Sequence, residues 1–181
     1  MKIAISSGHG KLVRGASGYL DEVNEARRVV EAIADNLEAI GVDVVTFHDD
    51  TSTTQSENLE TIVDFHNSET RDLDVSVHFN AYQTTSDPMG CEVLYLTQQE
   101  IAAEVAQAIS IGGNFINRGA KKRTDLYFLN NTDAPAILLE VCFVDSKMDA
   151  DLYRKYFERI CFVVASVAAP TDPEFQSGVA T

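Results

Sequence analysis

Short apolar runs alternate with helical patterns along this chain, and this alternation constrains the fold more than any other feature. Residues 3–5 are apolar, and in residues 22–40 Ala26, Ile33 and Leu37 recur on one helical face. Residues 42–47 then resume the strand pattern, and the alternation continues to residue 168. Strands that alternate with helices predict an α/β fold in which helices cover both faces of a sheet.

The expected elements have recognisable start and stop signals. Gly41 ends the first helix, a Thr97…Glu100 capping box opens the third, Gly112 breaks it, and Ser146 caps the last. Helices are expected over residues 22–40, 55–68, 97–111 and 147–168, and strands over residues 3–5, 42–47, 73–79, 91–96, 126–129 and 136–143. We therefore expect one folded domain over residues 1–169, followed by a disordered tail or linker stub over residues 170–181.

Composition excludes several classes of protein. The 181 residues carry 14 Lys and Arg against 28 Asp and Glu, a net charge of −14. Such a chain repels phosphate backbones, which argues against nucleic acid and anionic membranes as ligands. No apolar run approaches the roughly 20 residues of a membrane span, and the first residues lack the apolar core of a signal peptide. Cys91, Cys142 and Cys161 lie far apart in apolar runs, so we expect buried free thiols.

Polar residues interrupt apolar patterns at a few positions. Glu140 falls within the apolar run 136–144, and His9 and His78 lie at or near the ends of predicted strands. Ligands of α/β sheets gather at the carboxyl ends of the strands. A buried glutamate has a raised pKa unless a cation is near, so Glu140 is either a general acid or base or part of a structural ion pair. Taken alone, His9 could be a surface histidine. Taken alone, His78 could be a core histidine with its hydrogen bonds satisfied.

The first helix carries a glutamate on its apolar face. At about 100° per residue, Glu22 falls within the apolar sector and Glu25 at its margin. A buried carboxylate needs a cation or strong hydrogen bonds, although Glu22 could also stay solvated in the first turn. His48 and His66 lie in acidic, polar surroundings, and we expect both to be exposed.

Two histidines and a glutamate form a standard ligand set for catalytic zinc, together with a water. Such a metal lowers the pKa of bound water towards about 7 and polarises a carbonyl, and a separate carboxylate accepts the proton. The sequence lacks the HExxH helix that would identify such a site directly. The chemistry alone therefore leaves the zinc site as one hypothesis among several.

Six motifs in order resemble a known family: residues 7–10, 20–25, 74–81, 90–95, 117–121 with 126–129, and 134–145. The chain resembles the catalytic domain of zinc-dependent N-acetylmuramoyl-L-alanine amidases of the amidase 3 type over residues 2–165, and is most similar to those of phage endolysins. Two departures concern loop geometry: Ser6-Ser7 stands where the family usually has Asp-Pro, and Val141-Cys142-Phe143 where it has Gly-Phe after the glutamate.

The resemblance implies a site and a reaction. It implies that His9, Glu22 and His78 bind Zn²⁺ and that Glu140 is the catalytic carboxylate. It also implies a twisted sheet, and we expect this sheet to be mixed and largely parallel. The implied reaction is hydrolysis of the amide between N-acetylmuramic acid and L-alanine in peptidoglycan. Candidate substrate contacts are Asn80 and the basic residues Arg118 and Lys121, although the basic cluster could equally be a solvated turn.

Alternatives remain at this stage. A zinc carboxypeptidase or peptidase could cut another peptide bond of the wall, and a non-catalytic wall-binding module could keep a zinc-shaped pocket. The resemblance further implies a protein made in the bacterial host cytoplasm without a signal peptide, which acts at the cell wall. It also implies a wall-binding domain that is separate or missing on the C-terminal side.

Overall fold

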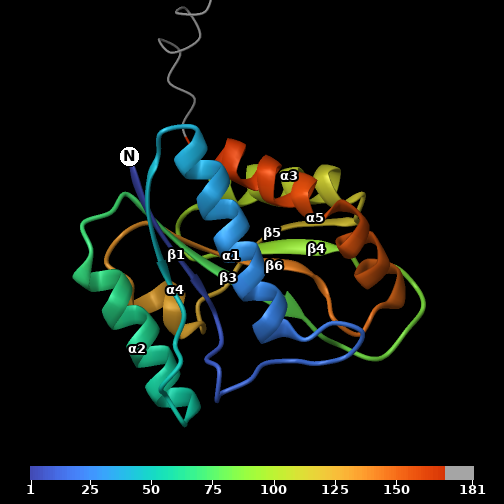
Figure 1. Cartoon of the computed structure of the whole chain (residues 1–181), viewed down its shortest axis with the longest axis horizontal. Coiled ribbons are helices and arrows are strands. Elements are labelled where there is room, and N and C mark those ends of the chain that lie inside the picture. Colours follow the sequence, from blue (N-terminus) through green and yellow to red (C-terminus); the bar gives the residue numbers. More distant parts are fainter. Residues whose placement is uncertain (170–181) are drawn as a thin grey trace, which may run out of the picture.

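A mixed sheet runs through the middle of the computed structural model, which describes residues 1–169 (Figure 1). Within this part the strand order is β2-β1-β3-β6-β4-β5. The strands β2, β1, β3 and β6 are parallel to one another. In contrast, β4 is antiparallel to β6, and β5 is parallel to β4. The strands are β1 (Lys2–Ser7), β2 (Asp43–Phe47), β3 (Leu73–Asn80), β4 (Cys91–Tyr95), β5 (Asn117–Lys122) and β6 (Ala136–Phe143). The predicted mixed, largely parallel sheet is confirmed.

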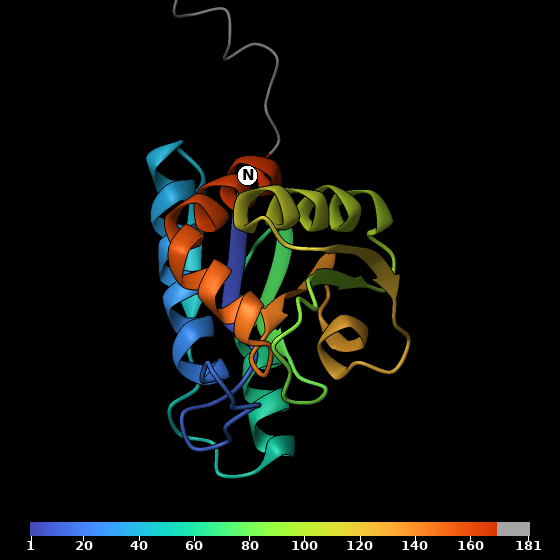
Figure 2. The ribbon, with the colours of Figure 1, turned by 90° about the vertical axis from the view of Figure 1, so that its right-hand side faces the viewer.

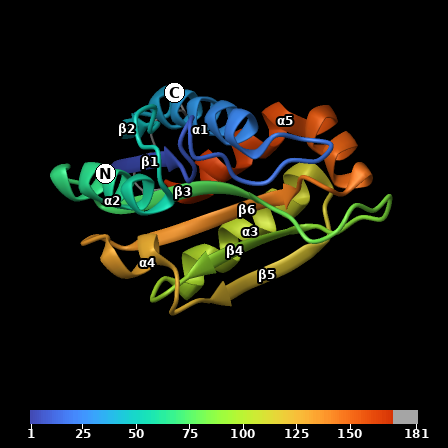
Figure 3. The same cartoon turned by 90° about the horizontal axis from the view of Figure 1, so that it is seen from below.

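Helices cover both faces of the sheet, as predicted. On one face, α1 (Glu22–Ala39), α3 (Gln99–Gly113) and α5 (Lys147–Ala168) bury one large apolar core against the strands. On the other face, α2 (Gln55–Ser68) and α4 (Tyr127–Asn131) enclose a smaller core that includes Phe128 and Leu138. Figures 2 and 3 show α1 and α5 together on one side of the sheet, and Figure 3 shows α2 and α4 on the other. Because both faces are covered, even the polar side of β3, with Asp74 and Ser76, is buried.

Two predicted elements are wrong. Residues 126–129 form no strand: α4 begins at Tyr127, because the adjacent Phe128 and Leu129 are both buried and the side chain of Asn130 donates to the carbonyl of Leu126. The strand of this region is β5, where the sequence predicts a basic turn. The Thr97…Glu100 capping box is also absent, since α3 has Gln98 as its N-cap without a side-chain bond.

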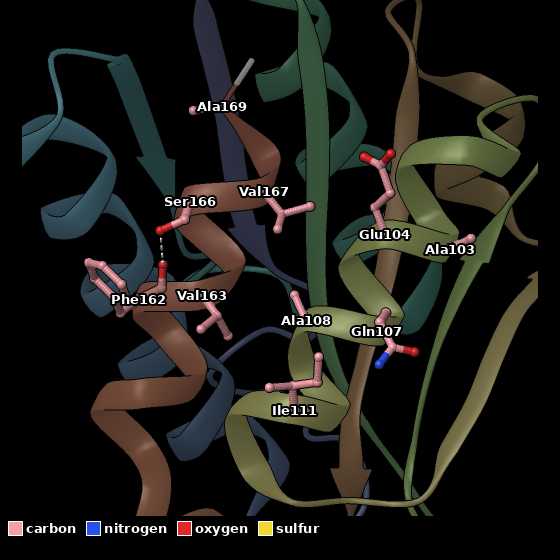
Figure 4. A pocket seen from close by; sticks show the side chains of 10 residues that line it. All are labelled: Ala103, Glu104, Gln107, Ala108, Ile111, Phe162, Val163, Ser166, Val167 and Ala169. Carbon is pink, nitrogen blue, oxygen red and sulfur yellow. Dashed lines mark hydrogen bonds between the residues drawn. The ribbon is translucent and has the colours of Figure 1, made fainter. Parts of the chain in front are cut away.

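Glycine lets two helices approach closely where α3 was expected to break. The helix continues through Gly113, and a methyl group on Gly112 would lie 2.7 Å from Cγ2 of Val163 in α5. Further along the same contact, α3 and α5 leave a groove of about 800 Å³, lined largely by apolar side chains (Figure 4). Among the described residues that line this groove, Glu104 alone is ionisable, so the groove lacks the groups that hydrolytic chemistry needs.

The remaining predictions about organisation have mixed outcomes. The three cysteines are buried and free, as predicted. None of the helices in residues 1–169 combines the length and apolar character needed to cross a membrane. The expected tail or linker stub over residues 170–181 lies outside the described residues.

Candidate metal centre and catalytic carboxyl

Three elements bring His9, Glu22 and His78 to one place. His9 lies in the loop after β1, Glu22 is the first residue of α1, and His78 lies near the end of β3. Figure 1 shows this loop, in blue, running below the sheet to the start of α1. One potential ligand atom from each residue lies within 4.8 Å of the other two. The three sequence-predicted ligands therefore form one cluster at the carboxyl edge of β1 and β3.

Two distances in this cluster fit a tetrahedral metal. Oε1 of Glu22 lies 3.5 Å from Nε2 of His9 and 3.2 Å from Nδ1 of His78. A tetrahedral zinc with bonds of about 2.0–2.1 Å has ligand atoms roughly 3.3–3.4 Å apart. Both imidazole nitrogens face the same carboxylate oxygen, and one ion can satisfy all three atoms. The donor set and its spacing thus fit Zn²⁺.

Backbone amides fix the orientation of Glu22. Oε1 accepts a hydrogen bond from the amide of Phe79 at 3.1 Å, and Oε2 accepts one from the amide of Ala16 at 2.7 Å. The residue is 3% exposed, so it does not stay solvated in the first turn of α1. Glu25, one turn further, instead accepts from the hydroxyl of Tyr153 and pairs with Arg28. The glutamate on the apolar face of the helix, Glu22, is therefore the one that lies in the cluster.

Two glycines make room for the cluster. A methyl group on Gly8 would lie 1.7 Å from Nε2 of His78, and one on Gly15 would lie 2.1 Å from Oε2 of Glu22. Neither glycine has a positive φ, so close approach rather than backbone conformation requires them. The loop 8–21 thus packs its backbone directly against the side chains that would hold a metal.

The ionisation of the cluster follows from burial and from mutual contacts. Burial lowers the pKa of His9, which favours the neutral imidazole that a metal binds. Burial also opposes charge on Glu22 and on His78, but their mutual hydrogen bond and the charges around them together outweigh it. The pKa of Glu22 is therefore lowered and that of His78 raised. Glu22 is consequently an ionised carboxylate, the form in which it can be a ligand.

Glu140 lies beside the cluster on the neighbouring strand. In the register of β3 and β6, Glu140 is paired with His78. Its Oε2 is buried without a hydrogen-bond partner among the described residues. Burial raises the pKa of this carboxyl to about 7, and the charges of Glu22 and Glu92 add to the effect. A carboxyl poised near neutral pH and free at one oxygen suits general acid and base catalysis better than a structural ion pair.

The candidate substrate contacts gather around Glu92, a residue that is absent from the sequence-based predictions. Glu92, in β4, accepts from Nε of Arg118 at 2.7 Å, from Nζ of Lys121, and from Nδ2 of Asn80 at 3.2 Å. Burial opposes its charge, but the bonds from Arg118 and Lys121 outweigh it and lower the pKa of Glu92. Its signal is present in the sequence, because Glu92 interrupts the apolar run 91–96 as Glu140 interrupts its own.

Two histidines are less exposed than expected. His66 is fully buried, with Nδ1 2.7 Å from Asp74 and Nε2 2.9 Å from the hydroxyl of Ser6. His48 is partly buried between the hydroxyl of Ser7 and the carboxylate of Glu31. The prediction that both are exposed is wrong, because partners distant in sequence satisfy them. Neither belongs to the cluster of ligands.

An α/β sheet whose edge joins a His₂Glu cluster to a separate buried carboxyl has the arrangement of a metallohydrolase domain. The family model described as N-acetylmuramoyl-L-alanine amidase, Amidase_3, matches residues 3–167. The chain therefore belongs to the N-acetylmuramoyl-L-alanine amidase family.

Solved structures agree with this assignment, and curated relatives share the sequence. The chain is 39% identical over 162 residues to an uncharacterized 38.4 kDa protein of Clostridium perfringens, covering 86% of the chain and 46% of that protein. It spans about half the length of the curated relatives it matches. The catalytic domain of an endolysin targeting Clostridia difficile superposes with a TM-score of 0.83 at 30% identity, covering 92% of this chain and 96% of that one. The amidase AmiC2 of Nostoc punctiforme gives 0.74 at 26%, with 92% and 94% covered.

Proposed function

We propose that this domain hydrolyses the amide between N-acetylmuramic acid and L-alanine in bacterial peptidoglycan, with Zn²⁺ as its cofactor. His9, Glu22 and His78 would hold the metal, and Glu140 would be the catalytic carboxyl. The observation that carries the proposal is the juxtaposition of ligand atoms at tetrahedral spacing with a buried carboxyl oxygen that has no partner among the described residues. Family membership supports the choice of bond.

Glu140 performs the proton transfers in this proposal. Bound zinc would supply polarisation of the scissile carbonyl and a lowered pKa for water. Glu140 accepts a proton from the attacking water at its buried carboxyl and later gives a proton to the nitrogen of the leaving L-alanine. A pKa of about 7 allows the same group to do both, because neither protonation state is strongly disfavoured near neutral pH.

The other groups of the site orient the ligands and the substrate and take no part in proton transfer. The amides of Ala16 and Phe79 hold Glu22, and Gly8 and Gly15 leave space for the ligands. Because two backbone amides hold the carboxylate of Glu22, this ligand is oriented before the metal arrives. Asn80, Arg118 and Lys121 would contact the substrate beyond Glu140.

Digestion of purified peptidoglycan tests the proposal. We expect new L-alanine amino termini without new reducing sugar ends. New amino termini elsewhere in the stem would indicate a peptidase, and wall binding without any product would indicate a binding module. Metal removal by a chelator should abolish the product, and added Zn²⁺ should restore it.

Variants of three glutamates separate the roles in the site. Glu140→Gln should keep zinc and lose turnover by roughly 10²–10⁴-fold, the scale of general acid and base catalysis. Glu22→Gln should lose zinc. Glu25→Gln is the matched control on the same helix, since Glu25 faces Tyr153 and Arg28, and it should keep both zinc and turnover. Near-normal turnover of Glu140→Gln would contradict the assignment.

The wider setting is also part of the proposal. The similarity to a structure described as the catalytic domain of an endolysin supports a phage lysin role at the cell wall, with wall recognition in a separate module. The folded unit would be residues 1–169. A protein of residues 1–169 that cleaves soluble muramoyl peptides as fast as the full chain would support this division.

A further inference from the structure

A row of polar side chains crosses four strands of the sheet next to the metal cluster. We name it the polar row. Its members come from β3, β6, β4 and β5 in that spatial order: His78, Asn80, Glu140, Glu92, Arg118 and Lys121. His78 is paired with Glu140 across β3 and β6, and Glu140 with Glu92 across β6 and β4. The row therefore starts at a metal ligand, passes the catalytic carboxyl and ends at two cations.

Glu92 joins the two cations at the end of the row. Arg118 and Lys121 both donate to Oε2 of Glu92, while Oε1 accepts from Asn80. Both cations therefore lie side by side around one oxygen of a carboxylate that is 7% exposed. Without the negative charge between them, Arg118 and Lys121 would repel each other and separate. Glu92 thus fixes a geometry that the two cations would not adopt alone.

The cluster around Glu92 keeps an unused positive charge. One carboxylate faces two cations, so the group carries a net +1 in a chain of net −14. The guanidinium of Arg118 is also held by the carbonyl of Met89 and by the ring of Phe143, 5.0 Å away. The side chains of Arg118 and Lys121 nevertheless remain 33% and 41% exposed. Donors that Glu92 and Met89 do not use therefore face solvent in a fixed arrangement.

The spacing of strands gives the distance from the reaction to these cations. Glu92 lies one strand from Glu140 and β5 lies two, which is about 5–10 Å. Two residues of an extended peptide span roughly 7 Å. A peptide that runs along the polar row from a cleaved bond next to Glu140 would therefore carry its second residue to Arg118 and Lys121. A carboxylate at that residue matches the unused charge and the N–H donors.

We propose that Glu92 is a positioning residue that holds Arg118 and Lys121 as a binding site for the carboxylate of the second residue of the stem peptide. This inference rests on the proposed function and names the part of the substrate that the polar row selects. Glu92 does not touch the substrate. It acts by keeping two cations in register with the cleaved bond.

Two soluble substrates test the inference. Both are disaccharide peptides from peptidoglycan, and they differ only in a carboxylate or a carboxamide on the second stem residue. We expect the zinc-loaded chain to prefer the carboxylate by about 10-fold or more in kcat/KM, mostly through KM, as for one charge-assisted contact. Equal kcat/KM for both would overturn the inference while leaving the amidase function intact. Cleavage of neither would overturn the proposed function, and the inference with it.

Variants separate positioning from general stability. Glu92→Gln should raise KM for the carboxylate substrate about 10-fold and abolish the preference for the carboxylate, with kcat within about 3-fold of the wild-type value. Glu92→Asp should restore part of this preference. Arg118→Ala should lose the preference with Glu92 intact. Lys122→Ala is the matched control, since this exposed lysine is paired with Tyr95 and points to the opposite face of β5. An unchanged or stronger preference in Glu92→Gln, with wild-type zinc content and melting temperature, would show that Glu92 does not position the cations.

Discussion

Replacement of Gly8 by alanine tests whether the packed loop sets the metal geometry. The added methyl group would lie 1.7 Å from Nε2 of His78, and ordinary van der Waals contact begins at 3.4 Å. One of the two groups must therefore retreat by about 1.7 Å. The backbone cannot retreat easily, because the amide of Gly8 donates to the carbonyl of Val77 at 2.9 Å. The imidazole of His78 should move instead.

The size of this displacement determines the expected loss of zinc. Metal sites tolerate deviations of roughly 0.2 Å in ligand distance, so a shift of about 1.7 Å removes His78 from the ligand set. Loss of an outer contact to a ligand already costs about 10–100-fold in metal affinity. We expect at least about 100-fold weaker zinc binding in Gly8→Ala, measured by competition with a chromophoric chelator, and zinc content well below one per chain by elemental analysis.

A neighbouring glycine provides the control. A methyl group on Gly10 would lie 3.0 Å from its nearest atom, the side-chain amide of Asn58, so it requires a retreat of only about 0.4 Å and none from His78. Gly10→Ala should therefore keep zinc and activity. The metal-free forms of both variants should melt within a few degrees of the metal-free wild type. Wild-type zinc affinity in Gly8→Ala would refute the reasoning, because it would mean that His78 is not a ligand or that the loop is free to move.

Three further predictions concern stability and reactivity. Asp74→Ala breaks the buried contacts to His66 and Arg71 and should cost about 3–5 kcal/mol, or roughly 6–20 °C of melting temperature by calorimetry. Burial opposes charge on Asp49, but hydrogen bonds from Ser52, Asn58 and Thr51 outweigh it and lower its pKa. Asp49→Asn should therefore lower the free energy of unfolding near pH 7. In denaturant titrations, the difference between variant and wild type should shrink as the pH falls through the folded-state pKa of Asp49. Protonation of Asp49 then removes the same stabilisation from the wild type. A thiol reagent should modify none of the three cysteines in the native chain and all three in denaturant, since all are buried and burial raises the pKa of Cys91 and Cys161 to about 12.

Two residues of the candidate site stand out in the sequence because they conflict with local patterns. Glu22 lies on an apolar helix face and Glu140 interrupts an apolar strand, and such residues are rare unless a partner compensates them. The glycines around His9 likewise indicate close packing. The same criterion identifies Glu92, but its strand is short, and its partners Arg118 and Lys121 are some 26–29 residues further along the chain.

Other errors came from tertiary contacts that no local pattern contains. His66 is polar and lies among acidic residues, so the sequence indicates a surface position. Its burial depends on Asp74 and Ser6, which the parallel pairing of β1 and β3 brings together. The helix α4 was missed for the opposite reason, since a four-residue apolar run fits a strand equally well until α2 is known to cover it.

The direction of the strands explains how one edge of the sheet acquires both halves of the site. The parallel strands β1, β3 and β6 end at this edge, and their carboxyl ends supply the histidines and Glu140. Beyond β6 the direction reverses, so β4 and β5 begin at the same edge, and Glu92 and Arg118 lie in their first two residues. A wholly parallel sheet would carry these residues to the opposite edge. The reversal at β6 and β4 is therefore what joins a metal-binding half to a cationic half, and the mixed sheet is a requirement of the proposed site rather than an incidental feature of the fold.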